Sequence, residues 1–243
     1  MLWVRFSIYN FKSFILNEKI TMLKRVIDIF FSGIGLLLFS PLLIIVSVIV
    51  FFQDFNNPLY IAPRVGRYRK QFMMVKLRSM IVSADKSGVD STSQDDKRIT
   101  WIGKFIRKCK LDEITQLWNV LIGDMSLVGP RPNVQRDVDI YTKKEIHLLD
   151  LRPGITDFSS IIFSDEGKIL SGSEDPDLDY NKLIRPWKSR LGLFYIKNQS
   201  FIVDIKLIFL TIYSILSRQK ALNKVSNLLY KLSADKKLVE IAK

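Results

Sequence analysis

FIRKCKLDEITQLWNVLIGDMSLVGPRP, residues 105–132, is the stretch of sequence on which the fold prediction depends. Apolar side chains recur in it at spacings of three and four residues, which is the pattern of one face of an amphipathic helix. They are Leu111, Ile114, Leu117, Trp118, Leu121 and Ile122. Gly123 and Asp124 end the predicted helix, and the following Gly-Pro-Arg-Pro forms a stiff turn that fixes the direction of Arg131.

Asp112 and Glu113 lie at the start of this predicted helix, just downstream of Arg107, Lys108 and Lys110. The helix dipole and the unpaired backbone N–H groups of the first turn stabilise negative charge there, and basic neighbours keep carboxylates ionised at neutral pH. An ionised aspartate can attack phosphorus, and an adjacent carboxylate can hold a magnesium ion on a diphosphate. The helix alone favours a simpler interpretation, in which Asp112 is an N-cap and Glu113 a dipole partner.

The complete motif changes this interpretation. LDExxQLWNVLxGDMSLVGPRP resembles the signature of the bacterial sugar transferases, the monotopic phosphoglycosyl transferases that load the first sugar phosphate onto a polyprenyl phosphate. The resemblance runs with gaps from about Lys24 to about Thr211, and it is specific because many positions match in order. It covers most of the chain and favours an enzyme.

The composition indicates a chain that is partly in contact with lipid. Hydrophobic residues make up 48% of the 243 residues, and the formal net charge is +13. Anionic headgroups and phosphorylated substrates both suit such a chain. Nucleic acid also suits the charge, but the sequence has no helix-turn-helix, zinc-finger or RNA-binding signature. Cys109 is the only cysteine and His147 the only histidine, which excludes an intrachain disulfide and makes serine–histidine chemistry depend on one residue.

An uncharged apolar segment, Ile29–Phe52, is long enough to span a bilayer as a straight helix. Ser40 and Pro41 fall near its middle, and proline removes a backbone donor, so we expect a bend there. Basic residues lie on both flanks: Lys24 and Arg25 before the segment, and Arg64, Arg67, Arg69 and Lys70 after it. The positive-inside rule places both flanks on the cytoplasmic side, which a single crossing cannot satisfy. We therefore predict a re-entrant helix broken at Ser-Pro, as in the resembled family, with a kinked single-pass helix as the alternative.

Two short β-favouring runs, Leu59–Ile61 and Phe72–Leu77, flank a basic turn and predict a β-hairpin. Lys76 and Arg78 alternate with apolar residues in the second run, so both can point away from an apolar face. They are either solvated strand residues or ligands for phosphate or carboxylate. The family pattern, RxGxxG followed by F and KxRSM, has a second glycine where this chain has Arg69, which affects the turn more than the chemistry.

Several other segments yield coarser expectations. Ser83–Asp96 is polar and acidic and is expected to be a mobile loop, followed by a helix over Trp101–Lys108. Asn133–Leu149 is charged and predicted to be helical. Ser164–Asp179 is a second acidic loop without the spacing of a calcium loop, and we interpret it as solvated.

The family element LRPGIT is a rigid loop before the strand-like run Phe158–Phe163. The family often continues there with Gly-Trp and a glutamine, whereas this chain has DFSSIIF from Asp157, so sugar specificity is expected to differ in this run. The segment Trp187–Leu216 resembles the closing helices of the family, but Gly192 stands where relatives commonly carry an acid. If that acid supports the active site, activity is weakened or its role moves to Asp204.

The resemblance implies an enzyme at the cytoplasmic face of a bacterial inner membrane, which moves a sugar 1-phosphate from a UDP-sugar to polyprenyl (undecaprenyl) phosphate and releases UMP. It implies that Asp112 is the nucleophile that forms a covalent phosphosugar intermediate, and that Glu113 holds Mg²⁺. Candidate phosphate or nucleotide ligands are Lys76, Arg78, Arg107 and Arg131. The implied partners are the two substrates and membrane lipid, with a homodimer or downstream glycosyltransferases left open and nucleic acid excluded.

The expected fold is α+β and mostly helical, with a re-entrant membrane helix, a small hairpin and interfacial amphipathic helices. Its divisions are an N-terminal extension (1–21), the membrane helix (22–54), a cytoplasmic catalytic domain (55–216) and a basic tail (217–243). Residues 1–21 are an extension, a mis-assigned start or an interfacial helix, and the tail is a surface helix or a partly disordered arm. A catalytically weak scaffold and a membrane-anchored binder of anionic lipid or nucleic acid are alternative functions. The sequence identifies neither the sugar nor the polymer.

Overall fold

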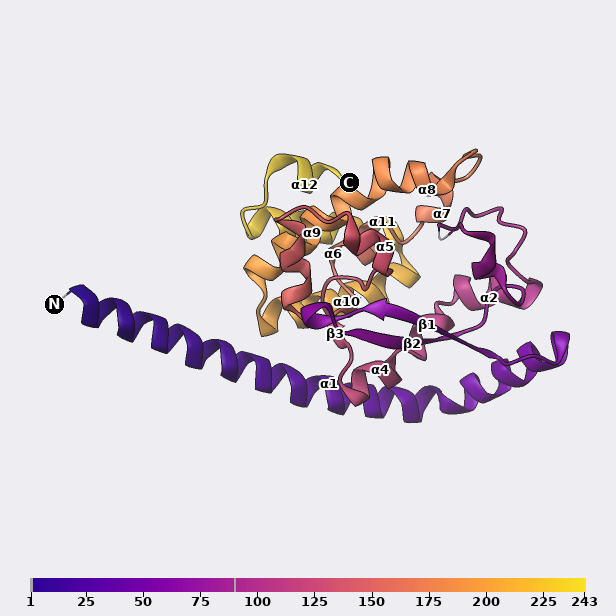
Figure 1. Cartoon of the computed structure of the whole chain (residues 1–243), viewed down its shortest axis with the longest axis horizontal. Coiled ribbons are helices and arrows are strands. Elements are labelled where there is room, and N and C mark those ends of the chain that lie inside the picture. The colour runs from indigo at the N-terminus through magenta and orange to yellow at the C-terminus, as the bar shows by residue number, and fades with distance from the viewer. Residues whose placement is uncertain (1, 90) are drawn as a thin grey trace.

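The computed structural model describes residues 2–89 and 91–243, with side chains described from Met22 onward. One long helix, α1 (Leu2–Asp54), runs along one side of a mostly helical domain that holds two small sheets (Figure 1). Among the described residues, only one helical segment is long and apolar enough to cross a membrane. It is the 33-residue part of α1 from Met22 to Asp54. The expected mostly helical α+β fold is confirmed, while the roles considered for residues 1–21 concern side chains outside the described part of the chain.

Helix α1 continues through Ser40 and Pro41, where the sequence predicted a break. Proline has no N–H to give to the carbonyl four residues earlier, here that of Leu37. The hydroxyl of Ser40 donates to this carbonyl at 2.8 Å and so supplies the missing hydrogen bond. The helix curves in its second half (Figure 1), and the Ser-Pro pair does not end it.

Strands β1 (Leu59–Val65) and β2 (Gln71–Leu77) form the predicted hairpin, in antiparallel register with Tyr60 opposite Lys76. The turn contains Arg69 at φ 62°, in the left-handed region. Glycine, which the family has at this position, adopts that region freely, whereas another residue meets a cost of about 1 kcal/mol. Arg69 therefore adopts a backbone conformation that a glycine would adopt at lower cost.

Helices α2 (Trp101–Lys108), α3 (Leu111–Ile114) and α4 (Leu117–Ile122) follow the hairpin. Helix α2 has the predicted bounds, but the single helix predicted after it is divided into α3 and α4. The predicted apolar face is not the buried one either. Trp118 is 50% exposed, whereas Asn119 is fully buried.

The polar face of α3 and α4 is buried because it covers the free edge of β2. Asn119 accepts a hydrogen bond from the N–H of Val75 at 2.9 Å and donates to the carbonyl of Met73 at 2.8 Å. The hydroxyl of Thr115 lies 3.2 Å from the carbonyl oxygen of Val75. A buried strand edge needs such partners, so polar side chains are buried here beside Leu111 and Val120, while Trp118 and Ile122 are exposed.

A second sheet joins two motifs that lie apart in the sequence. Strands β3 (Ser126–Val128) and β4 (Gly154–Thr156) pair in parallel, which places the Gly-Pro-Arg-Pro turn beside the LRPGIT element. Gly129 and Gly154 meet backbone to backbone, since a Cβ on Gly154 would lie 2.1 Å from the nitrogen of Gly129. The two motifs therefore form one rigid unit, and this unit positions Arg131.

The run from Phe158 is helix α6 (Phe158–Ile162), not the predicted strand. Asp157 caps this helix, because its carboxylate accepts a hydrogen bond from the N–H of Ser160 at 2.7 Å. Phe158 and Ile161 are buried in the main core. The remaining short helical elements are η1 (Arg67–Arg69), η2 (Ala84–Ser87), α5 (Gln135–Asp139), η3 (Glu145–Asp150), α7 (Glu166–Ile169), α8 (Pro176–Asp179) and η4 (Tyr180–Ile184).

The main core is completed by the C-terminal helices, which are α9 (Arg185–Asn198), α10 (Phe201–Leu216), α11 (Arg218–Lys231) and α12 (Lys236–Glu240). The side chains of Val225 and Leu229 on α11 and of Leu238 on α12 are buried in this core. The sequence suggested a surface helix or a disordered arm for residues 217–243. In the structure these residues are part of the folded domain.

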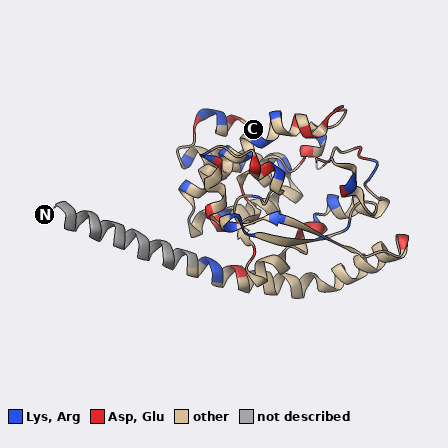
Figure 2. Cartoon of the chain, viewed as in Figure 1, with Lys and Arg blue, Asp and Glu red and all other residues tan. Residues whose placement is uncertain are grey.

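Charged residues lie at both ends of the apolar part of α1 (Figure 2), and their contacts fix both ends to the same domain. At one end, Arg25 donates to two carbonyl oxygens at the end of α4, at 2.5 and 2.8 Å, and Asp28 accepts from the N–H of Leu127 at 3.0 Å. At the other end, Asp54 forms an ion pair with Arg78 at 2.5 Å. The uncharged stretch between Asp28 and Asp54 therefore begins and ends against one domain.

Candidate active site

A cleft of about 1510 Å³ collects most of the predicted site residues. One wall comes from β2, α2, α3 and the Gly-Pro-Arg-Pro turn, and we call it the motif wall. The opposite wall comes from the segment 164–188. The motif wall carries the predicted residues Lys76, Arg107, Asp112, Glu113 and Arg131. The structure therefore brings five of the proposed site residues to one cleft.

Asp112 and Glu113 are adjacent in the chain but differ in their contacts. The Glu113 carboxylate accepts a hydrogen bond from Arg131 Nη2 at 3.1 Å, and its other oxygen lies 3.8 Å from Lys110 Nζ. Among the residues that the structure describes, none forms a hydrogen bond or ion pair with the Asp112 carboxylate. Asp112 thus has its oxygens available to a ligand, while Glu113 is held in place.

The electrostatic environment separates the same two carboxylates. Burial raises the pKa of Asp112, and the neighbouring Glu113 raises it further, against the opposing effect of Lys76 and Arg107. Burial would also raise the pKa of Glu113, but Arg131, Lys110 and Lys76 hold it below its usual value. The expectation that basic neighbours keep both groups ionised fits Glu113, whereas for Asp112 desolvation outweighs them.

Three cations of the motif wall face these carboxylates. Burial and the nearby Arg131 lower the pKa of Lys76 to about 8, so its ammonium titrates close to neutral pH. Arg107 donates from Nε to Ser79 Oγ at 3.0 Å, which fixes its guanidinium from α2. Arginine stays protonated at any ordinary pH, so the wall keeps positive charge beside Asp112.

Arg78 is the one predicted phosphate ligand whose placement argues against that role. It is 7% exposed, and its guanidinium binds Asp54 at 2.5 and 2.6 Å and the carbonyl oxygen of Asn57 at 2.8 Å. These bonds attach the end of α1 to β2. The alternation that made Arg78 a candidate is real, but its side chain serves the join between helix and sheet.

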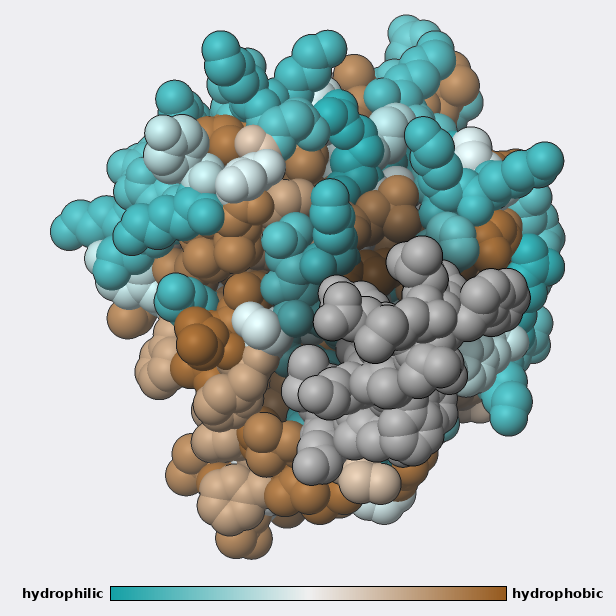
Figure 3. Space-filling model, turned by 90° about the vertical axis from the view of Figure 1, so that its left-hand side faces the viewer, coloured by the Kyte–Doolittle hydropathy of each residue, from teal (hydrophilic) through white to brown (hydrophobic). Residues whose placement is uncertain are grey.

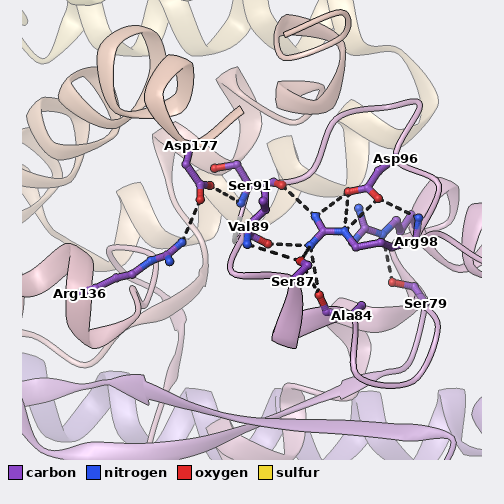
Figure 4. Close-up of polar contacts among 10 residues, drawn as sticks. Ser79, Ala84, Ser87, Val89, Ser91, Asp96, Arg98, Arg136 and Asp177 are labelled. Carbon is purple, nitrogen blue, oxygen red and sulfur yellow. Dashed lines mark hydrogen bonds and ion pairs between the residues drawn. The ribbon is translucent and has the colours of Figure 1, made fainter. Parts of the chain in front are cut away.

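The loop before α2, which we expected to be mobile, is organised around Arg98. The Arg98 guanidinium donates to the carbonyl oxygens of Ala84 and Val89 at 3.2 and 2.7 Å and to Ser87 Oγ at 2.6 Å (Figure 4). It also forms an ion pair with Asp96 at 2.7 Å. The loop therefore has a defined set of contacts at the rim of the cleft.

The same loop is joined to the acidic segment that we interpreted as solvated. Asp177 accepts a hydrogen bond from the N–H of Ser91 at 2.7 Å and pairs with Arg136 at 3.1 Å (Figure 4). The N–H of Gln94 donates to the carbonyl oxygen of Gly167 at 2.8 Å. The acidic segment is therefore a wall of the cleft.

Three residues on this second wall were missed by the sequence analysis. Glu166 and Lys188 form an ion pair, and the Lys188 ammonium lies 5.0 Å from the centre of the Tyr180 ring. Burial would raise the pKa of Glu166, but Lys188 and Arg131 hold it below its usual value. The only sequence signal was the charge of the segment, because no motif links positions 166, 180 and 188. Sugar specificity was instead expected in Asp157–Phe163, which is largely buried and does not line the cleft among the described residues.

Gly192 lies outside the cleft, buried on α9. A Cβ there would lie 2.7 Å from Leu148 Cδ2 and 3.7 Å from Pro130. Asp204, to which an acid's role was suggested to move, does not line the cleft; it pairs with Lys24 and accepts a hydrogen bond from the Tyr195 hydroxyl at 2.6 Å. These contacts of Asp204 lie on the side of α1. Neither Gly192 nor Asp204 therefore contributes a side chain to the cleft.

Comparison with known proteins supports the reading of the motifs. The sequence model of the family "Bacterial sugar transferase" matches residues 19–218. The UDP-N-acetylgalactosamine-undecaprenyl-phosphate N-acetylgalactosaminephosphotransferase of Aeromonas hydrophila is 32% identical over 198 residues, which is 80% of this chain and 44% of that protein. The undecaprenyl-phosphate galactose phosphotransferase of Salmonella typhimurium is 35% identical over 214 residues, 82% of this chain and 41% of that protein. The exopolysaccharide production protein ExoY of Rhizobium meliloti is 31% identical over 206 residues, 79% of this chain and 84% of that protein. The chain thus spans less than half the length of the first two relatives and most of the third.

Proposed function

Because this chain belongs to the bacterial sugar transferase family, we propose that it transfers a sugar 1-phosphate from a UDP-sugar to undecaprenyl phosphate and releases UMP. One observation carries the proposal. The unpaired carboxylate of Asp112 faces a cleft lined by Lys76, Arg107 and Arg131, and the cleft belongs to a domain attached to an apolar helix. The names of the Aeromonas and Salmonella relatives support undecaprenyl phosphate as the acceptor.

The proposed transfer has two steps at one phosphorus atom. An oxygen of Asp112 attacks the sugar-bearing phosphorus, the bond to the bridging oxygen breaks, and UMP leaves with that oxygen. The product is a phosphosugar bound to Asp112. A phosphate oxygen of the lipid then attacks the same phosphorus, which releases the Asp112 carboxylate and forms an undecaprenyl diphosphate sugar. The raised pKa of Asp112 suits this role, because a more basic carboxylate is a better nucleophile once it is ionised.

The cations of the motif wall stabilise the charge of the diphosphate. Arg107 is fixed by Ser79 next to Asp112, where its guanidinium can contact phosphate oxygens. Lys76 adds a second positive charge while it is protonated. Arg131 holds Glu113 with one nitrogen and lies on the same wall, so it is placed for the nucleotide side of the diphosphate.

The carboxylates of this wall suit a magnesium ion that is coordinated jointly by the protein and by the phosphates of the substrate. The described residues contain no group of three or more His, Cys, Asp or Glu side chains that could hold a metal by themselves. Mg²⁺ is commonly bound by one or two carboxylates together with substrate phosphates and water, and Glu113 beside Asp112 supplies such a pair. When bound there, Mg²⁺ would neutralise the diphosphate. We therefore assign Glu113 as its protein ligand.

The apolar surface supports attachment to a membrane. The outer side chains of α1 are apolar and exposed, and α10 carries a further exposed set at Phe201, Ile202, Phe209, Ile212 and Leu216. Hydrophobic side chains gather in the lower part of Figure 3, on the side of α1, and hydrophilic ones in the upper part. We infer that α10 lies in the membrane interface beside the apolar part of α1, with the cleft facing the soluble substrate.

We also infer that α1 enters and leaves the bilayer on the cytoplasmic side of the inner membrane. Asp28 and Asp54 fix the two ends of the apolar stretch to one domain, which supports re-entry over crossing. The test uses Thr21→Cys and Asn56→Cys, each in a Cys109→Ser background, with an impermeant maleimide. Labelling of both cysteines in inverted vesicles, and of neither in intact spheroplasts, is expected. Labelling of the two from opposite sides would establish a single-pass helix.

The mass of the intact protein tests the function. Detergent-purified full-length protein is incubated with Mg²⁺ and each of several UDP-sugars, without lipid acceptor. A mass increase of one sugar phosphate is expected with at least one donor, and Asp112→Asn should show none and lose turnover about 10⁴-fold or more. Addition of undecaprenyl phosphate should remove the adduct as UMP release continues.

The same experiment defines what would overturn the proposal. Turnover retained in well-folded Asp112→Asn protein would exclude Asp112 as the nucleophile. UMP release by the wild type without any adduct would favour direct transfer between the substrates. No release with any UDP-sugar, even from a crude nucleotide-sugar extract, would favour the scaffold function.

A further inference from the structure

The second wall of the cleft presents a carboxylate that the proposed transfer does not use. The side chain of Glu166 is 40% exposed, whereas that of its ion-pair partner Lys188 is only 14% exposed. Both residues line the cleft, together with Tyr180. The ammonium is therefore withdrawn against Glu166 and the Tyr180 ring, and the group offered to a ligand is the carboxylate.

Glu166 shares its electrostatic neighbours with the carboxylates of the motif wall. Arg131 donates to Glu113 at 3.1 Å, and although burial opposes it, Glu113 and Glu166 together raise the pKa of Arg131. Burial lowers the pKa of Arg107, and the charges of Asp112 and Glu166 both oppose this effect. Glu166 therefore lies near the same guanidinium groups as the Asp112–Glu113 pair, and all of these side chains line one cleft. A diphosphate bound to these cations would direct one of its sugar rings toward Glu166.

We propose that Glu166, held in place by Lys188, binds two neighbouring hydroxyl groups of a sugar ring of the nucleotide-sugar donor. The inference rests on the proposed function, since it takes the cleft to bind a UDP-sugar. An ionised carboxylate only accepts hydrogen bonds and has two oxygens, which matches a pair of adjacent hydroxyl donors. Where this ring is the transferred sugar, the charge of Glu166 repels the carboxylate of a uronic acid and favours a neutral sugar. The ring is either the transferred sugar or the ribose, since both carry such hydroxyl pairs.

Binding measurements test this subsite without depending on turnover. The full-length Asp112→Asn protein is titrated by calorimetry with UDP-galactose, UDP-glucose, UDP-N-acetylgalactosamine, the deoxy analogue of the tightest of these, and UDP. Glu166→Gln in the same background should weaken binding of the UDP-sugar about tenfold or more, because a hydrogen bond to a charged group is lost. Glu174→Gln, an exposed acid of the same segment that does not line the cleft, is the matched control and should change nothing.

A structural effect of the substitution is separated by a second variant. Glu166→Gln leaves Lys188 without its carboxylate partner, whereas Glu166→Gln combined with Lys188→Met removes both charges. Both variants should bind the UDP-sugar equally weakly while the double variant regains the wild-type unfolding midpoint. The deoxy analogue that lacks a bound hydroxyl should lose most of its sensitivity to Glu166→Gln.

The arms of the titration identify the ring. Weaker binding of UDP-sugars with unchanged binding of UDP would place the transferred sugar at Glu166, and equal weakening of both would place the ribose there. Affinities equal to those of Glu174→Gln would overturn the inference, even if the wild type forms the adduct and releases UMP. A wild type that does not turn over, but whose donor affinity falls in Glu166→Gln, would overturn the proposed transfer and leave the subsite standing.

Discussion

The two walls of the cleft present similar chemistry, carboxylates paired with cations, but the chain encodes them differently. The motif wall draws Arg107, Asp112, Glu113 and Arg131 from one run of 28 residues, 105–132. The second wall draws Glu166 from α7, and Tyr180 and Lys188 from the contiguous elements η4 and α9, which a loop separates from α7. A short, dense motif can be recognised in one sequence, whereas a site assembled across loops has no local pattern. The proposals assign the common reaction to the first wall and recognition of the individual substrate to the second.

The buried amide of Asn119 tests whether the motif wall depends on its contact with the hairpin. Asn119→Ala leaves the N–H of Val75 and the carbonyl of Met73 without their partner, both at a buried strand edge. We expect a loss of about 2 kcal/mol of unfolding free energy, which is about 30-fold in the folding constant. For a chain of this size that lowers Tm by roughly 5 °C, measured by scanning calorimetry in detergent.

The control for this change is Asn223→Ala on α11, where the side chain is exposed. It should shift Tm by no more than about 1 °C, since isolated surface substitutions have small effects. A similar Tm for both variants would mean that α4 is held by its apolar contacts with α1 alone. The motif wall would then depend on its contact with α1 more than on its contact with the hairpin.

The sequence predicted the motif wall well, and particular residues show where prediction stopped. Asp112, Glu113 and Arg131 were found because a helix start and a rigid turn constrain residue types locally. The buried face of α4 was predicted the wrong way round, since periodicity finds two faces but does not say that a strand edge covers one of them. Arg78 had the pattern of a ligand, yet its role depends on Asp54, which lies at the end of a distant helix.

The second wall shows the opposite limit. Glu166 and Lys188 are 22 residues apart in a charged segment, and only the tertiary fold brings them together as an ion pair. Phe158–Phe163 has a strand-like composition, but the single cap formed by Asp157 is enough to begin a helix there. Residues whose meaning comes from tertiary contact therefore stay hidden until the fold is known.

The ammonium of Lys76 gives the motif wall a pH dependence that the second wall lacks. Its pKa of about 8 means that it is charged at pH 7 and loses its charge above pH 8. If this charge binds phosphate, kcat/KM should fall with an apparent pKa near 8 and be about tenfold lower at pH 9 than on the plateau. Lys76→Arg, whose guanidinium does not titrate in this range, should give a flat profile.

The stability of the protein should respond to the same proton in the opposite direction. In the native state the Lys76 ammonium loses its proton near pH 8, while in the unfolded state it keeps its proton up to about the ordinary pKa of 10.5. Between these values the unfolded state binds more protons, so the contribution of Lys76 to stability rises as activity falls. An alkaline loss of activity that coincides with a falling Tm would therefore come from unfolding and would contradict the assignment to Lys76.

Gly192 gives the smallest expected effect, and it connects the two walls. It lies one helical turn after Lys188 on the same face of α9, where it contacts the Gly-Pro-Arg-Pro turn through Pro130. In Gly192→Ala the new methyl comes too close only to the flexible end of Leu148, at 2.7 Å, and makes an ordinary contact with Pro130, while alanine gains about 1 kcal/mol of helix propensity. We expect Tm to change by at most about 3 °C and kcat/KM for the UDP-sugar to stay within about twofold.

Steady-state UMP release with Leu148→Ala/Gly192→Ala, in which the methyl has room, is the control. A fall in kcat of tenfold or more in both variants would show that the packing of α9 against Pro130 sets the geometry of Arg131, so that the second wall acts on catalysis as well as on recognition.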